Sequence, residues 1–168
     1  MHCQGAGRGH CSGTWVFGLP AGGLLPSTPR VARSWGAACN APDFDLDLEL
    51  FPDAPTGFIG VARDERTLEP VPYLDSVPAD LEGRPVLVLD PMLATGGSLA
   101  FACGLLRDRN PGRVTAVCVL AAPEGVHRIA TSGLVDELVV ASIDERLNDV
   151  AYIVPGLGDA GDRLFGTA

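Results

Sequence analysis

The chain has 168 residues, of which 46% are hydrophobic and 20% charged, a composition that predicts one folded domain and excludes a disordered chain. Its formal net charge of -9 argues against nucleic acids and anionic membranes as general partners. The five cysteines form no CxxC pair, which favours a reduced, cytoplasmic protein, and no apolar run is long enough to span a bilayer.

Residues 1–48 are predicted to form an irregular or divergent amino-terminal segment. Glycine and proline interrupt this segment, and no apolar period of a strand or a helix is present. The spacing of its histidines and cysteines matches no common zinc pattern, so we expect no metal site there. The alternating run DFDLDLEL at 43–50 is interpreted as a solvated acidic linker, with a half-exposed edge strand as the alternative.

Residues 49–168 are predicted to form one α/β domain. Runs of branched apolar residues are typical of strands that are buried on both faces of a parallel sheet. Alternation of such strands with helical spacing indicates a parallel sheet with crossover helices. In chain order we expect strands at 56–63 and 84–90, a helix at 99–109, a strand at 113–122, a short helix at 123–133, a strand at 135–144 and a strand or loop at 151–154.

The loops that follow the buried strands are expected to meet at one edge of the sheet, where ligands bind in such folds. They are residues 91–98, 123–125 and 143–149, and the glycine-rich tail at 151–167 is a further candidate for this edge. The polar stretch at 64–83 contains three prolines and is interpreted as a hairpin arm or a flap.

The loop at 91–98, which we call the glycine loop, has the composition of a phosphate site. Thr95, Gly96, Gly97 and Ser98 lie between a strand and a helix, where the first backbone amides have no partner within the helix. Glycine allows close approach of the backbone, and the hydroxyls add donors. The sequence lacks the P-loop pattern and its lysine, so a phosphomonoester fits better than a polyphosphate. An ordinary strand-to-helix turn is the alternative interpretation.

Asp90 ends the buried strand just before the glycine loop. Its carboxylate can accept hydrogen bonds from sugar hydroxyls or help to hold magnesium, so the two features together describe a sugar 5-phosphate site. The tail places four glycines around Asp159 and Asp162, which is typical of backbone near a ligand, although a plain coil explains it equally well. His127 is predicted to be a surface residue, and no covalent nucleophile is indicated.

Several separated motifs resemble the uracil phosphoribosyltransferase family. They are VLVLDPMLATGGS, LAAPEGV, IDERLND and YIVPGLGDAGDRLFGT, with ARDERTLEPVPY resembling the segment ahead of the family's flap. The resemblance implies a type I phosphoribosyltransferase fold, a parallel sheet with flanking helices. It implies transfer of phosphoribosyl from 5-phospho-α-D-ribose 1-diphosphate to uracil, giving UMP and diphosphate in pyrimidine salvage. It also implies Mg²⁺ bound with the diphosphate, a cytoplasmic location and a homo-oligomer.

The resemblance also implies the site residues. Asp90 and Asp159 would be the catalytic carboxylates near the phosphoribosyl group, and Arg63 would approach the diphosphate. Residues implied to bind the donor are Arg63, Asp90, Pro91, Met92, Leu93, Ala94, Thr95, Gly96, Gly97, Ser98 and Asp159. Residues implied to bind uracil are Ile153, Gly158, Asp159 and Ala160.

One family feature has no counterpart in this sequence, the Pro-Ile-Leu-Arg-Ala-Gly turn that binds diphosphate. The first strand of the sheet and one ligand of the leaving group are therefore expected to be missing, which predicts weak turnover. The alternative function is that of an inactive relative which only binds a ribose phosphate or UMP. A third possibility, an RNA-binding regulator with the same fold, is disfavoured by the net charge of -9.

Overall fold

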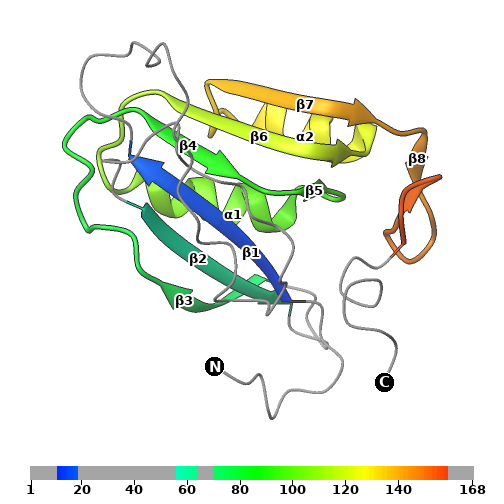
Figure 1. Cartoon of the computed structure of the whole chain (residues 1–168), viewed down its shortest axis with the longest axis horizontal. Helices are drawn as coiled ribbons and strands as arrows, with labels where there is room; N and C mark the ends of the chain where they lie inside the picture. The colour runs from blue at the N-terminus through cyan, green and yellow to red at the C-terminus, as the bar shows by residue number, and fades with distance from the viewer. Residues whose placement is uncertain (1–10, 19–55, 64–69, 159–168) are drawn as a thin grey trace, which may run out of the picture.

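The structure is a computed structural model and describes residues 11–18, 56–63 and 70–158. These residues form a mixed sheet with two helices packed against it, and a small two-stranded sheet beyond it (Figure 1). The elements are β1 Cys11–Gly18, β2 Thr56–Arg63, β3 Pro70–Asp75, β4 Val86–Leu89, β5 Met92–Leu93, α1 Gly97–Arg107, β6 Val114–Ala121, α2 Pro123–Ser132, β7 Glu137–Ile143, β8 Arg146–Leu147 and β9 Ile153–Val154.

The carboxyl-terminal half of the large sheet is parallel, as the sequence predicted. β6 pairs in parallel with β4, with β5 and, along its other side, with β7. β4 and β5 follow one another along the same side of β6, since β4 pairs with residues 114–117 and β5 with residues 120–121. The order of the large sheet is β3-β2-β1-β4-β6-β5, with β7 paired to β6. The expected α/β fold is thus confirmed.

β1 shows that the prediction for the amino-terminal segment was wrong at residues 11–18. This strand lies between β2 and β4 and pairs antiparallel with both. Its sequence, CSGTWVFG, has no clear alternation, so its conformation comes from backbone pairing with two neighbours rather than from local preference. The edge of β4 that was expected to be open is therefore covered. The run at 43–50 lies outside the described residues, and the domain boundary at residue 49 stays a prediction.

The polar stretch after β2 includes a hairpin arm. β3 pairs antiparallel with β2 and forms the outer edge of the sheet, where the missing N–H groups of Pro70 and Pro72 are tolerated. Arg109, just after α1, donates from Nη1 to Asp75 Oδ1 and to the carbonyl of Val77, both at 2.9 Å. These bonds tie the end of the arm to the end of α1.

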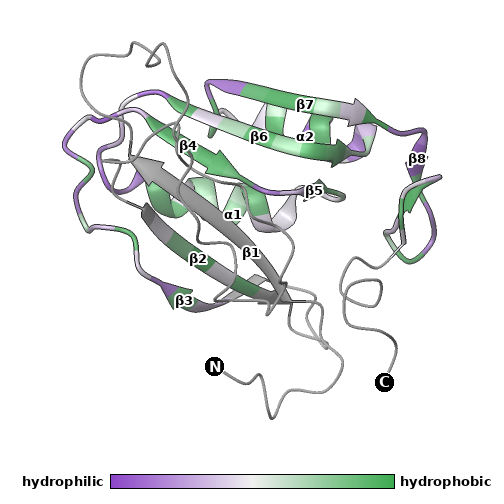
Figure 2. Cartoon of the chain, viewed as in Figure 1, coloured by the Kyte–Doolittle hydropathy of each residue, from purple (hydrophilic) through white to green (hydrophobic). Residues whose placement is uncertain are grey.

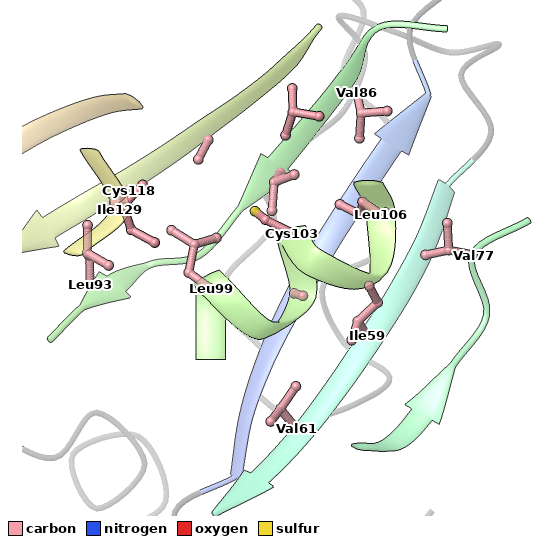
Figure 3. Packing of buried hydrophobic residues seen from close by; sticks show 14 of the residues in the cluster. Ile59, Val61, Val77, Val86, Leu93, Leu99, Cys103, Leu106, Cys118 and Ile129 are labelled. Atoms are coloured by element: carbon pink, nitrogen blue, oxygen red, sulfur yellow. The ribbon is translucent and has the colours of Figure 1, made fainter. Parts of the chain in front are cut away.

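The core lies between the sheet and the two helices, which cover the same face (Figures 1 and 3). Side chains of α1 enter it every three to four residues, at Leu99, Ala102, Cys103 and Leu106. Figure 2 shows that β4, β6 and β7 are mainly hydrophobic and that the connecting turns are more hydrophilic. Among the described residues, no helix is long and apolar enough to cross a membrane.

Candidate functional site

The loops after β4, β6 and β7 meet at one end of the sheet, which we call the carboxyl edge. The Ala122 amide donates to the carbonyl of Leu93 at 2.9 Å, and the Asp144 amide donates to the carbonyl of Ala121 at 2.9 Å. Figure 1 shows β5, the start of α2 and β8 at this same end. The predicted meeting of the three loops is therefore confirmed.

The glycine loop leads directly into the first turn of α1. Gly96 is the N-cap residue and has φ +73°, a left-handed conformation in which a side chain would be strained. Gly96 has no side chain to cap the helix, the Gly97 amide makes only a long hydrogen bond, 3.4 Å to Thr95 Oγ1, and the first turn contains no acidic residue. The positive end of the helix is therefore not neutralised by the helix itself, which is the arrangement of an anion site.

The first turn of α2 packs directly on the glycine loop. A Cβ atom on Gly125 would collide with the carbonyl oxygen of Ala94 and would lie 3.0 Å from that of Leu93. A Cβ atom on Gly96 would lie 3.2 Å from the carbonyl oxygen of Gly125. The absence of side chains at both glycines thus allows the amino-terminal ends of the two helices to converge at the carboxyl edge.

Asp90 is a buried carboxylate at the centre of this edge, with only 8% of its surface exposed. Its Oδ1 atom accepts one long hydrogen bond, 3.3 Å from the amide of Met92, and Oδ2 accepts none from the described residues. Burial raises the pKa of Asp90 to about 7, against the smaller, opposite effect of the Met92 amide. Buried polar groups normally have their partners, so a carboxylate with open acceptor capacity indicates a functional site.

Two cysteines lie in the core near this carboxylate. Cys103 and Cys118 are buried free thiols, in agreement with their interpretation as small apolar residues. Burial, and secondarily the charge of Asp90, raises the pKa of each thiol to about 12. Neither thiol is therefore suited to act as a nucleophile.

The carboxyl-terminal tail is fixed to the carboxyl edge by two acids that the sequence analysis did not single out. Glu124 Oε1 accepts the amide of Leu147 at 2.9 Å, and Asp144 Oδ2 accepts the amide of Gly156 at 2.8 Å. Between these bonds, β8 and β9 form an antiparallel pair. The alternative of a strand at 151–154 is thus confirmed in part, at 153–154.

The residues proposed to read uracil belong to this tail. Ile153 is buried, with 5% of its surface exposed, whereas Gly158 is exposed. Asp159 and Ala160 lie outside the described residues, so their roles stay predictions.

Arg63 is the last residue of β2. Because β2 and β4 are both antiparallel to β1, they run in the same direction, and Arg63 lies toward the same end of the sheet as Asp90. His127 is exposed on α2, as predicted. Arg128, which the sequence analysis passed over, lies beside the glycine loop: its Nη1 atom would be 3.6 Å from a Cβ atom on Gly97.

The donor set suits a metal ion that arrives with a ligand. No group of three or more metal-binding side chains occurs in the described part of the chain. Magnesium, however, often binds through one or two carboxylates together with substrate phosphates, and the open Oδ2 of Asp90 fits that role.

The comparisons with known proteins agree with this geometry. The family model of uracil phosphoribosyltransferase matches residues 45–167. The uracil phosphoribosyltransferases of Corynebacterium diphtheriae and Corynebacterium glutamicum are 61% and 58% identical over 122 residues, which are 73% of this chain and 58% of each of those proteins. The structure of the AQ2163 protein from Aquifex aeolicus has a TM-score of 0.60 and 48% identity, covering 67% of this chain and 53% of that chain. This chain therefore spans little more than half the length of the relatives that it matches, and it belongs to the uracil phosphoribosyltransferase family.

Proposed function

We propose that this chain transfers the phosphoribosyl group of 5-phospho-α-D-ribose 1-diphosphate to uracil, giving UMP and diphosphate. The observation that carries the proposal is the buried carboxylate of Asp90, which has open acceptor capacity beside a helix N-terminus with a glycine as N-cap and no acidic residue in its first turn. A sugar phosphate supplies what both groups lack, because its hydroxyls donate to a carboxylate and its phosphate accepts from amides. Membership of the family supports the choice of substrates.

In this proposal, catalysis needs no covalent bond to the protein. The C1–O bond to diphosphate breaks with its electron pair going to diphosphate, and positive charge builds on the ribose ring. Uracil N1 attacks C1 from the opposite face and loses its proton, which the departing diphosphate can accept. The glycine loop holds the 5-phosphate, while Asp90 orients the ribose hydroxyls and, with Asp159, favours the cationic ring. Hydrogen bonds from the ribose hydroxyls and the positive charge of the ring would lower the raised pKa of Asp90. The carboxylate therefore ionises when the substrate binds.

Charge on the leaving group is balanced by Arg63 from the end of β2. Magnesium, carried by the donor, would neutralise further charge on the diphosphate. Uracil is proposed to lie against Ile153 and to be read by the backbone at Gly158 and Ala160. Of the segment at 64–83, the part that follows Arg63 and precedes β3 is proposed to exclude water during transfer, since β3 leads away from the carboxyl edge. A cytoplasmic location and a homo-oligomeric state belong to the same proposal.

A second candidate is a relative that binds a ribose phosphate or UMP without turnover. It is favoured by the lack of the Pro-Ile-Leu-Arg-Ala-Gly turn in the sequence. Removing such a contact to a leaving group would raise the barrier by about 3 kcal/mol, or more than a hundredfold in rate.

The deciding experiment measures UMP formation from uracil and the donor with Mg²⁺, beside the C. diphtheriae enzyme. We expect turnover that is slower than the relative's and is abolished in Asp90→Asn and Thr95→Val. The matched control is Asp108→Asn, which removes an exposed carboxylate at the end of α1 opposite to the glycine loop. Saturable UMP binding without turnover would favour the second candidate, and failure to bind either the donor or UMP would refute both.

A further inference from the structure

We propose that Arg128 is a phosphate-binding residue, whose guanidinium supplies positive charge to a phosphomonoester held by the glycine loop. The inference rests on the proposed function and adds to it a residue that the family motifs do not contain. Arg128 would supply the positive charge that a bound phosphate needs, because the glycine loop itself offers only amides and hydroxyls. A phosphomonoester carries close to two negative charges at neutral pH, more than one helix end neutralises.

Arg128 differs from the other arginines in its pairing. The chain has no lysine, so arginine provides every permanent positive side chain. In the part of the chain with described side chains, five arginines are within salt-bridge distance of an acid, whereas Arg128 has no acidic partner. The five pairs are Arg84–Glu82, Arg107–Asp136, Arg109–Asp75, Arg113–Glu137 and Arg146–Glu145.

The position of Arg128 on α2 directs its side chain toward the glycine loop. Arg128 follows Gly125 by three residues, so both lie on the helix face that packs against the glycine loop. Long side chains on a helix point back toward its N-terminus, which here is the direction of the carboxyl edge. Gly125 permits the close packing, and Arg128, one turn later, extends over the loop.

Arg128 also lies close to the glycine loop. A Cβ atom built on Gly96 would lie 3.5 Å from Arg128 Cδ, and one on Gly97 would lie 3.6 Å from Arg128 Nη1. These are ordinary contact distances, so the guanidinium lies next to the backbone that carries the first amides of α1. A phosphate oxygen bound to these amides would be within reach of the planar donor group, which suits phosphate better than an ammonium does.

The test is a calorimetric titration of the full chain with ribose 5-phosphate, and with ribose as the uncharged analogue. Arg128→Gln is expected to bind ribose 5-phosphate about fivefold to tenfold more weakly, as for the loss of one charged hydrogen bond at an exposed site. Binding of ribose should not change. Arg128→Lys should recover part of the loss, and the deficit of Arg128→Gln should shrink as salt is raised.

The matched control is Arg113→Gln, which removes the same charge at the opposite end of β6, where Arg113 pairs with Glu137 at 3.1 Å. Equal affinity of Arg128→Gln and the wild type for ribose 5-phosphate would overturn the role of Arg128 and leave the proposed function intact. An equal loss in Arg113→Gln, or a parallel loss of ribose binding, would show a general charge effect or structural damage and would also overturn it. If the wild type binds no ribose 5-phosphate, the proposed function fails as well.

Discussion

Replacing Asp90 by asparagine would test whether the carboxyl edge holds a carboxylate that is costly to ionise until a ligand arrives. Asparagine keeps the shape of the side chain and can still accept the amide of Met92, but it carries no charge. The residue is only 8% exposed, so the effect of desolvation is not diluted by solvent. The substitution therefore removes the charge of the side chain while keeping its shape.

The change of the free energy of unfolding with pH follows from the pKa of Asp90, which burial raises from 3.8 to about 7. Because the folded state holds the proton more tightly, the contribution to stability is complete below the unfolded value and is lost as the pH rises to about 7. This loss is on the order of 4 kcal/mol, at about 1.4 kcal/mol per pH unit. Roughly two of the three units lie above pH 5, so the wild type should lose about 3 kcal/mol between pH 5 and pH 8 that Asp90→Asn does not lose.

Urea unfolding of both proteins at pH 5 and pH 8 measures this difference, and the other titrating groups cancel because both proteins share them. Asp149→Asn, in an exposed turn, should follow the wild type at both pH values. Ribose 5-phosphate at pH 8 should stabilise the wild type but bind Asp90→Asn poorly. If the two proteins lost stability in parallel, the carboxylate of Asp90 would be ionised and well solvated when folded, and the argument from burial would be refuted.

Three further substitutions test the packing around this edge. Gly125→Ala should lower the free energy of unfolding by about 1–3 kcal/mol, because its methyl group would collide with the backbone of the glycine loop. Its control, Gly104→Ala in α1, meets nothing within 4 Å and should raise the free energy of unfolding by up to about 1 kcal/mol. Equal urea midpoints for the two variants would contradict this. Asp75→Asn should lower the free energy of unfolding by about 1 kcal/mol, and by less in high salt, because it removes the ion pair with Arg109. Arg109 holds the pKa of Asp75 below its usual value, so the wild type should lose the stabilisation by this ion pair as the pH falls below about 4. Asp144→Ala frees an amide in the turn after β9 and should raise the KM for uracil several-fold while leaving the donor KM unchanged; an equal change in both would indicate general damage.

The parallel half of the sheet could be predicted because its signals are local. β4 and β6 are near-continuous runs of branched residues, and the spacing in α1 repeats every three to four residues. β1 could not be predicted in this way, since two neighbours supply its pairing and its own sequence contains glycine without alternation. β8 and β9 have two residues each, too few for any period to be visible.

Some parts of the site also depend on local sequence, whereas others depend on contacts between distant residues. The glycine loop and Asp90 are contiguous, so their chemistry could be predicted from fifteen residues of sequence, 86–100. Asp144 and Arg128 act across contacts between elements, and only the fold brings them to the loop or to the tail. The spacing of Gly125 and Arg128 by three residues was a usable signal, but it acquires meaning only once Gly125 is known to face the glycine loop.

The burial of Asp90 links the site to a strand outside the family motifs. β1 lies before residues 45–167, which match the family, and it pairs Trp15 with Leu89, the residue next to Asp90. On the other side of β4, the Asp90 amide donates to the carbonyl of Val117 in β6 at 3.1 Å. The carboxylate therefore ends a strand that is covered on both sides, and an open edge at β4 would admit water and lower its pKa toward the ordinary value. It follows that the DPMLATGGS motif specifies the groups of the site, while the strands on either side of it set how strongly those groups respond to a ligand.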